Sequence, residues 1–204
     1  PKAPGHTMSL WILWNDEPFS LNGGEALLIK GSNRENATFA VYLDKDSSGN
    51  RILRFTQKVK YRRKRWCRGI GGDKCAKDDS GYRVYTVEKE ITEALIPGRW
   101  MHIAAMFNNK WHEETMSICV DGDCTTKDPK RQGRYGCGGY KCQEWAILNV
   151  VDYPKNNLFI GMMPNGDDQF NGKMDDIQIF SDTLTDAEIM AIYQRGREKD
   201  FICR

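Results

Sequence analysis

Arg62-Arg63-Lys64-Arg65 is the stretch of the sequence with the clearest chemical potential, because guanidinium and ammonium groups bind anions. It lies in a segment, Lys58 to Lys77, that contains nine Lys or Arg and one acid, whereas the whole chain carries a net charge of +2. The other 184 residues therefore have a net charge of −6. Such asymmetry is typical of a basic appendage on an acidic body.

Aromatic residues accompany the basic run, since Tyr61 precedes it and Trp66 follows it. Aromatic rings and guanidinium planes stack on sugar rings or bases. We predict that the run binds an anionic glycan such as heparan sulfate, or a protein partner, with nucleic acid less favoured. Two alternatives remain, a solvated loop and a dibasic cleavage site for secretory-pathway convertases. The predicted binding residues are Arg62, Arg63, Lys64, Arg65, Trp66 and Arg68, with Lys130, Arg131 and Arg134 as extensions.

Six of the seven cysteines form close sequence pairs. Asp121-Gly122 predicts a two-residue hairpin turn, which sets Cys119 opposite Cys124 with their Cα atoms about 4.5 Å apart. Zinc held by two C-x4-C units is the alternative. Disulfides, together with the glycosylation sequon at Asn36, favour a secreted or cell-surface protein. The predicted disulfides are Cys67–Cys75, Cys119–Cys124 and Cys137–Cys142, with Cys203 left over.

Short alternating or apolar segments, separated by Gly, Asn and Asp clusters, predict an all-β fold that positions these residues. Thr185-Asp-Ala-Glu188 is a capping box and predicts one helix of about ten residues, ending at Gly196. No apolar run reaches the roughly 18 to 20 residues of a bilayer span. The predicted strands are Ser9–Trp14, Ala26–Ile29, Phe39–Leu43, Ile52–Lys58, Tyr82–Glu88, Trp100–Phe107, Thr115–Val120, Asn157–Gly161 and Met174–Phe180.

The length of 204 residues predicts a single domain, residues 1–204. The alternating pattern disappears in two basic, cysteine-bearing insertions, near residues 58–79 and 127–153. Long insertions in a compact domain are usually functional or disordered. We expect both insertions to be long, disulfide-bonded loops that leave an otherwise compact β-sandwich.

Five motifs follow one another in a fixed order along the chain, and they are Pro97–Ala104, Ser117–Gly122, Asn157–Gly161, Phe170–Phe180 and Leu184–Ile189. As a set, they resemble the laminin-G-like and pentraxin-like jelly-roll domains of the concanavalin A-like superfamily. The resemblance implies a two-sheet antiparallel jelly-roll sandwich with one short C-terminal helix. The chain departs from the pattern in its insertions, its short-range cysteines and an opening strand that we expect to be absent before Ser9. Cys203 is expected to pair with a residue upstream of Pro1.

The resemblance also suggests two possible functions, calcium binding and glycan cleavage. The resemblance suggests calcium, with Asp167, Asp168 and Asp175 as ligands, although turns have the same composition. Glu88-Lys-Glu90-Ile-Thr-Glu93 approximates the E-x-D-x-x-E pattern of related glucanases, but it falls next to an expected loop. A solvated acidic strand end is the preferred interpretation.

His6, His102 and His112 show no ligand or triad spacing, and His102 is expected to be a structural residue of a strand. We therefore predict a non-catalytic extracellular binding or adhesion module with no required cofactor, part of a larger protein. A glycan-cleaving enzyme on the same fold and a purely structural domain of a larger ectodomain are the alternatives.

Overall fold

The computed structural model describes residues 5–15, 24–32, 37–68, 78–109, 115–127, 141–150 and 157–202. Within these ranges, the side chains are described except at residues 61–68, 78–80, 141–150 and 199–202. All statements below refer to this part of the chain.

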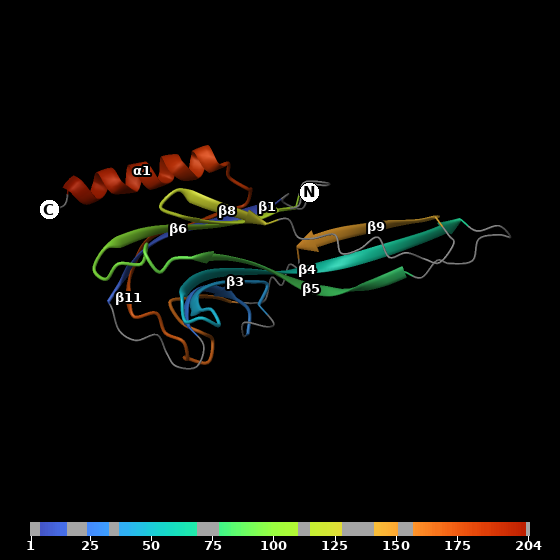
Figure 1. The fold of residues 1–204 in the computed structure, drawn as a ribbon, viewed down its shortest axis with the longest axis horizontal. Helices are drawn as coiled ribbons and strands as arrows, with labels where there is room; N and C mark the ends of the chain where they lie inside the picture. Colours follow the sequence, from blue (N-terminus) through green and yellow to red (C-terminus); the bar gives the residue numbers. More distant parts are fainter. Residues whose placement is uncertain are drawn as a thin grey trace.

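Two antiparallel sheets pack face to face in a sandwich (Figure 1). The first has the order β11-β1-β6-β7-β8, and the second has the order β10-β2-β3-β4-β5, with β9 paired to the far half of β4. The strands are β1 (Gly5–Trp14), β2 (Glu25–Lys30), β3 (Phe39–Lys45), β4 (Arg51–Arg68), β5 (Asp78–Glu90), β6 (Trp100–Asn108), β7 (Thr115–Val120), β8 (Asp123–Lys127), β9 (Lys141–Val150), β10 (Leu158–Ile160) and β11 (Gly172–Phe180).

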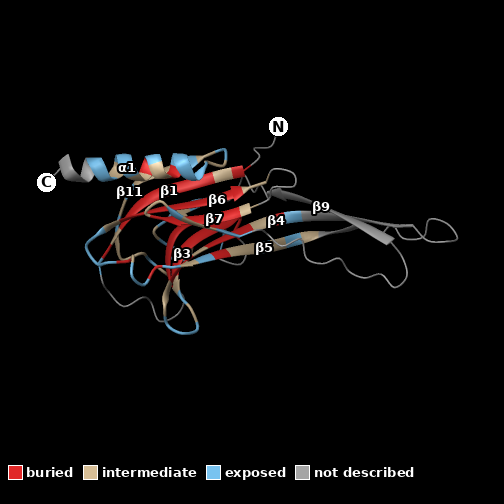
Figure 2. Cartoon of the chain, turned by 45° about the horizontal axis from the view of Figure 1, so that its top comes forward, coloured by how far each residue is buried: buried red, intermediate tan, exposed pale blue. Residues whose placement is uncertain are grey.

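The main core lies between the two sheets, where Figure 2 shows the buried residues gathered. Alternate residues of β1, such as Leu10 and Ile12, belong to the same core cluster as Leu53 and Phe55 of β4, and all four are fully buried. Alternation with period two sends these side chains to one face of each strand. The predicted fold class, a two-sheet antiparallel jelly-roll sandwich, is confirmed.

The opening strand of the sandwich is present, contrary to the sequence prediction. β1 begins at Gly5 and lies between β6 and β11, with Thr7 opposite both Met106 and Phe180. The hydroxyl of Thr7 donates to the carbonyl of Asp182 at 3.0 Å. The polar residues at this end show no hydrophobic alternation, so only their pairing on both sides identifies them as strand.

The single described helix, α1 (Asp186–Ile202), has 17 residues rather than the predicted ten or so. The capping box is confirmed, because the Glu188 amide donates to the Thr185 hydroxyl at 3.3 Å and the Thr185 amide donates to Glu188 Oε2 at 2.7 Å. Gly196 does not end the helix. A Cβ at Gly196 would lie 2.5 Å from Cζ2 of Trp11, so glycine is needed for close packing of α1 on the five-stranded sheet (Figure 1).

β4 and β5 are much longer than the predicted Ile52–Lys58 and Tyr82–Glu88, and β9 lies where no strand was predicted. Part of the second insertion, residues 141–150, therefore forms a regular strand. Outside the sandwich there is no second sheet to cover, so the strands lose their hydrophobic alternation while keeping their backbone pairing. The three extended strands project from the sandwich in Figure 1.

A candidate anion-binding face on a three-stranded arm

Strand β4 changes partner at the edge of the sandwich. Its first half pairs with β3 as far as Gln57 opposite Phe39, and its second half pairs with β9 from Val59 to Arg68. The opposite edge of β4 stays paired with β5 up to Lys64. We call residues 59–68, 78–83 and 141–150 the arm; β4 is its central strand.

The arm is strongly basic, with eight Lys or Arg and three Asp or Glu. Its charges separate between the two faces of the sheet. Both ladders run through the arm without a register shift, so strict alternation assigns each residue to a face. The reference points are Phe55 and Val59, which are buried in the sandwich core, and Lys60, which is exposed on the other face.

The face that includes Lys60 carries most of the positive charge, and we call it the cationic face. Its one acid is Asp78, at the position opposite Lys64. Tyr82, Trp145 and Trp66 also lie at register positions of this face. Its basic positions are Lys60, Arg62, Lys64, Arg68 and Lys141, continued at the root by Lys58.

The other face is nearly neutral, and we call it the balanced face. Arg63 is directly opposite Asp79, and Arg65 is directly opposite Glu144. Directly opposed residues of opposite charge are the stabilising arrangement in antiparallel strands. Arg83 is the third basic residue of this face, opposite Val59.

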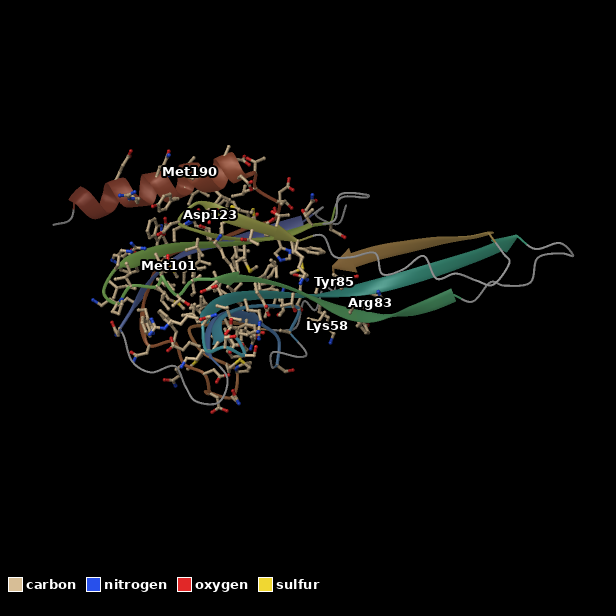
Figure 3. The ribbon with its side chains drawn as sticks, viewed as in Figure 1. Lys58, Arg83, Tyr85, Met101, Asp123 and Met190 are labelled. Atoms are coloured by element: carbon tan, nitrogen blue, oxygen red, sulfur yellow. A yellow bond between two sulfur atoms is a disulfide. The ribbon has the colours of Figure 1, made fainter. Side chains whose placement is uncertain are left out.

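The root of the cationic face shows which side chains a ligand would meet. Tyr82 and Val84 are 53% and 46% exposed, which is high for large apolar residues on a strand. The ammonium group of Lys58 lies 5.5 Å from the centroid of the Tyr82 ring. Figure 3 labels Lys58 and Arg83 at the point where the arm leaves the sandwich. An exposed ring beside cations can bind a sugar ring and its acidic substituent together.

The predicted binding residues thus separate into two sets. Arg62, Lys64, Trp66 and Arg68 belong to the cationic face, whereas Arg63 and Arg65 belong to the balanced face. Tyr82 and Trp145 were not among the predicted binding residues, because the sequence around Trp145 has no regular alternation that would assign it to a face. Lys130, Arg131, Arg134 and the Asn36 sequon lie outside the described residues.

The dibasic sequence sits in the central strand of the arm. Residues 62–64 are paired on one side with β5 and on the other with β9. A convertase binds its substrate as an extended segment whose backbone is free to pair, by strand addition. Cleavage after Arg65 therefore requires the arm to open first.

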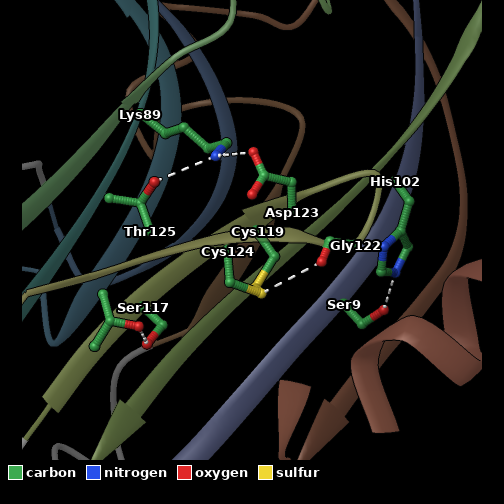
Figure 4. The surroundings of a disulfide bond; sticks show 10 residues. Ser9, Lys89, His102, Ser117, Cys119, Gly122, Asp123, Cys124 and Thr125 are labelled. Atoms are coloured by element: carbon green, nitrogen blue, oxygen red, sulfur yellow. Dashed lines mark hydrogen bonds and ion pairs between the residues drawn. A yellow bond between two sulfur atoms is a disulfide. The ribbon is translucent and has the colours of Figure 1, made fainter. Parts of the chain in front are cut away.

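The disulfide between Cys119 and Cys124 is present, as predicted, and links β7 to β8 across the Asp121-Gly122 turn (Figure 4). Both thiols of one C-x4-C unit are thereby used, which excludes the four-thiolate zinc alternative. The backbone register also places Cys67 directly opposite Cys142, a pairing that was not predicted. The predicted partners of these two residues, Cys75 and Cys137, lie outside the described residues, as does Cys203.

The predicted calcium ligands do not form a cluster. Asp167 Oδ2 accepts a hydrogen bond from the Asn165 amide group at 2.6 Å, and Asp175 Oδ1 accepts one from the Asp176 backbone amide at 2.8 Å. In the part of the chain that the structure describes, no group of three or more His, Cys, Asp or Glu side chains could hold a metal ion. Asp167 and Asp168 lie in the loop between β10 and β11, in agreement with the turn alternative, whereas Asp175 lies within β11.

The glucanase-like pattern is divided between a strand and a turn. Glu88 lies on the outer face of β5 and forms an ion pair with Arg54 at 2.7 Å, and Arg54 also pairs with Asp44. Glu93 follows the end of β5, in an exposed turn.

Glu25, at the start of β2, is a buried carboxyl group that was not among the predicted site residues. Its burial raises its pKa. Its Oε2 accepts a hydrogen bond from the Asn171 amide at 3.3 Å.

His102 is a buried structural residue, as predicted. One ring nitrogen, Nε2, is 2.8 Å from the hydroxyl oxygen of Ser9 (Figure 4). The imidazole also lies next to the rings of Trp11 and of Tyr193 in α1. Burial lowers the pKa of His102 to about 4, so the ring is neutral at physiological pH. The buried pair has no solvent access for a substrate.

No helix among the described residues is long and apolar enough to span a bilayer.

Comparison with known proteins identifies relatives in fold only. No protein-family model matches the sequence, and no curated protein matches it significantly. The fold is similar to that of the Ruminococcus gnavus IT-sialidase CBM40 bound to α2,3-sialyllactose, with a TM-score of 0.54 and 15% identity over 94% of this chain and 83% of that chain. The same CBM40 bound to α2,6-sialyllactose gives a TM-score of 0.51 and 16% identity, over 94% and 84% of the two chains.

A heptameric SAP-like pentraxin from Limulus polyphemus is a more distant match, with a TM-score of 0.48 and 14% identity over 94% of this chain and 70% of that chain. Identities this low establish the fold alone. The chain is a jelly-roll sandwich of the concanavalin A-like type, carrying a basic three-stranded arm.

Proposed function

We propose that the chain is a non-catalytic extracellular binding and adhesion module that recognises an anionic glycan through the cationic face of its arm. One observation carries this proposal. The register of β4 with β5 and β9 collects most of the basic residues and several aromatic residues on one face, while the acids that oppose Arg63 and Arg65 lie on the other.

The fold supports a carbohydrate ligand. CBM40 of the R. gnavus sialidase shares the sandwich and is bound to sialyllactose. Sandwich proteins commonly carry their specificity on appendages rather than on the sheets themselves. The arm is the appendage of this chain on which positive charge is concentrated.

Two further features support the extracellular and non-catalytic parts of the proposal. The disulfide between Cys119 and Cys124 is stable in an oxidising compartment. Glu88, one carboxylate of the glucanase-like pattern, forms an ion pair with Arg54, and Glu93 lies in a separate turn. A glycosidase needs two carboxyl groups facing one cleft.

The test compares two double variants that remove the same charge from neighbouring positions. Arg62→Ala/Lys64→Ala removes two cations from the cationic face, and Arg63→Ala/Arg65→Ala removes two from the balanced face. We expect the first variant to bind immobilised heparin about tenfold more weakly than wild type, since each exposed ionic contact contributes up to ~1 kcal/mol. The second should bind within about threefold of wild type.

Thermal unfolding of both variants must match wild type for the comparison to hold. Binding of wild type should weaken steeply as salt is added, because counterions compete for the cationic face. Equal losses of affinity in the two variants would contradict the assignment of the site to one face. Release of reducing sugar from a panel of anionic glycans would contradict the non-catalytic proposal, and Glu88→Gln would then identify the acid.

A further inference from the structure

All the cations of the cationic face except Lys141, which lies on β9, form a single row along β4. Lys58, Lys60, Arg62 and Lys64 occupy alternate positions of β4, and Arg68 follows after Trp66. Alternate residues of a strand are about 6.8 Å apart, so the row from Lys58 to Arg68 is roughly 34 Å long. Its width is one residue, because all five belong to the same strand.

The flanking strands bring few charges to this row. On the β5 side, the positions opposite Lys58, Lys60 and Arg62 are Val84, Tyr82 and Ser80. On the β9 side, mainly neutral residues also oppose the row. They are Asn149 opposite Lys60, Ile147 opposite Arg62, Trp145 opposite Lys64 and Gln143 opposite Trp66. The two flanking charges are Asp78, opposite Lys64, and Lys141, opposite Arg68.

This arrangement distinguishes between two kinds of anionic ligand. A compact ligand with one acidic group is best held by several cations that converge on one point from different strands. A linear polymer with regularly repeated anionic groups is best held by cations repeated along a line. The row has the second form, with neutral and aromatic positions on both sides where sugar rings can pack.

We infer that the ligand is a linear, repeatedly charged glycan, such as a sulfated glycosaminoglycan chain, which lies along β4 and contacts the row over several sugar units. This inference rests on the proposed function and specifies its ligand class. Each cation along the row then contributes a similar, modest share of the affinity, and a ligand too short to cover the row loses the contacts beyond its end.

The experiment measures the affinity of wild type for size-defined heparin oligosaccharides, from a disaccharide upward, with sialyllactose as a short probe of single charge. We expect the affinity to rise with each added disaccharide until the chain covers roughly 34 Å, and then to level off. Lys60→Ala, Arg62→Ala and Lys64→Ala should each weaken binding of the longest chain by a similar factor, about threefold. Arg63→Ala is the matched control and should have little effect.

The outcomes separate the inference from the proposed function. If a disaccharide or sialyllactose binds as tightly as the longest chain, or if one of the three single variants removes nearly all affinity, the ligand is compact; the inference then fails and the proposed function stands. If none of these probes binds at low salt, both fail. Rising affinity with chain length and equal effects of the three variants support both.

Discussion

His102 illustrates how burial decides the chemistry of a single residue. Its imidazole lies between β1 and the helix α1, next to Trp11, and Nε2 is within hydrogen-bonding distance of Ser9. Desolvation lowers its pKa from 6.5 to about 4, against a smaller opposite effect of Asp176. Burial lowers the pKa of His6 to about 4 in the same way. Both residues are therefore neutral parts of the folded structure.

The stability of the protein should consequently fall in acid. The folded-state pKa of about 4 is lower than the unfolded value of 6.5, so the unfolded chain takes up the proton first as pH decreases. Each histidine contributes stability that is fully present above pH 6.5 and is lost as pH falls towards 4, by up to ~1.4 kcal/mol per pH unit.

Urea unfolding at several pH values between 7 and 4 measures this dependence. We expect His102→Gln to be less stable at neutral pH but to show a shallower loss of unfolding free energy in acid. His6→Gln should remove a comparable share of the slope. An unchanged slope in both variants would contradict the assignment of the acid sensitivity to these two rings.

At the scale of elements, β4 connects the sandwich to the candidate site. Its first half is a core strand, and its second half is the central strand of the arm. Directly opposed residues in antiparallel strands have Cα atoms about 4.5–5.5 Å apart, which is within the range of a disulfide. The register places Cys67 and Cys142 in this relation, near the far end of the pairing between β4 and β9.

We predict a Cys67–Cys142 disulfide in the oxidised protein. Peptide mapping without reduction should find these two residues in one cross-linked peptide. The Cys119–Cys124 disulfide serves as the internal control in the same map. A cross-link between Cys67 and Cys75 would instead support the pairing expected from the sequence, and would show that β9 does not hold this register in solution.

At the scale of the whole molecule, the sandwich and the arm have different sources of stability. The sandwich buries large side chains between two sheets, including Phe55, Phe107 and Trp14. The arm is a single layer, in which β9 pairs with β4 and β4 pairs with β5. A single layer buries less apolar surface per residue, so its hydrogen bonds should open at lower free energy than those of the core.

Hydrogen exchange tests this difference. Amides of residues 59–68 and 141–150 should exchange earlier than those of β1 and β6, and a bound heparin oligosaccharide should slow exchange in the arm alone. Equal protection of arm and core in the free protein would contradict the independence of the two parts. Protection by heparin that is confined to the sandwich would place the binding site elsewhere.

Features that depend on neighbours in the sequence were predictable. The capping box joins residues three positions apart, and the Cys119–Cys124 disulfide spans a two-residue turn. Most strands of the sandwich were predicted with boundaries within a few residues, because burial on one or both faces imposes an apolar pattern on them. The exceptions are β1, β4 and β5, which are longer than predicted, and the largely exposed β8, which was not among the predicted strands. The all-β sandwich and the basic character of the insertions follow from the same local information.

The role of Gly196, the start of β1 and the course of the arm were not predictable in this way. Gly196 looks like a helix stop until Trp11 is placed against it. The arm has no second sheet to cover, and its strands pair over many intervening residues, so no local pattern encodes their register. The sequence determined that a β-sandwich would carry a concentrated positive charge. Only the tertiary structure decided which cations share a face, because that depends on how distant strands align.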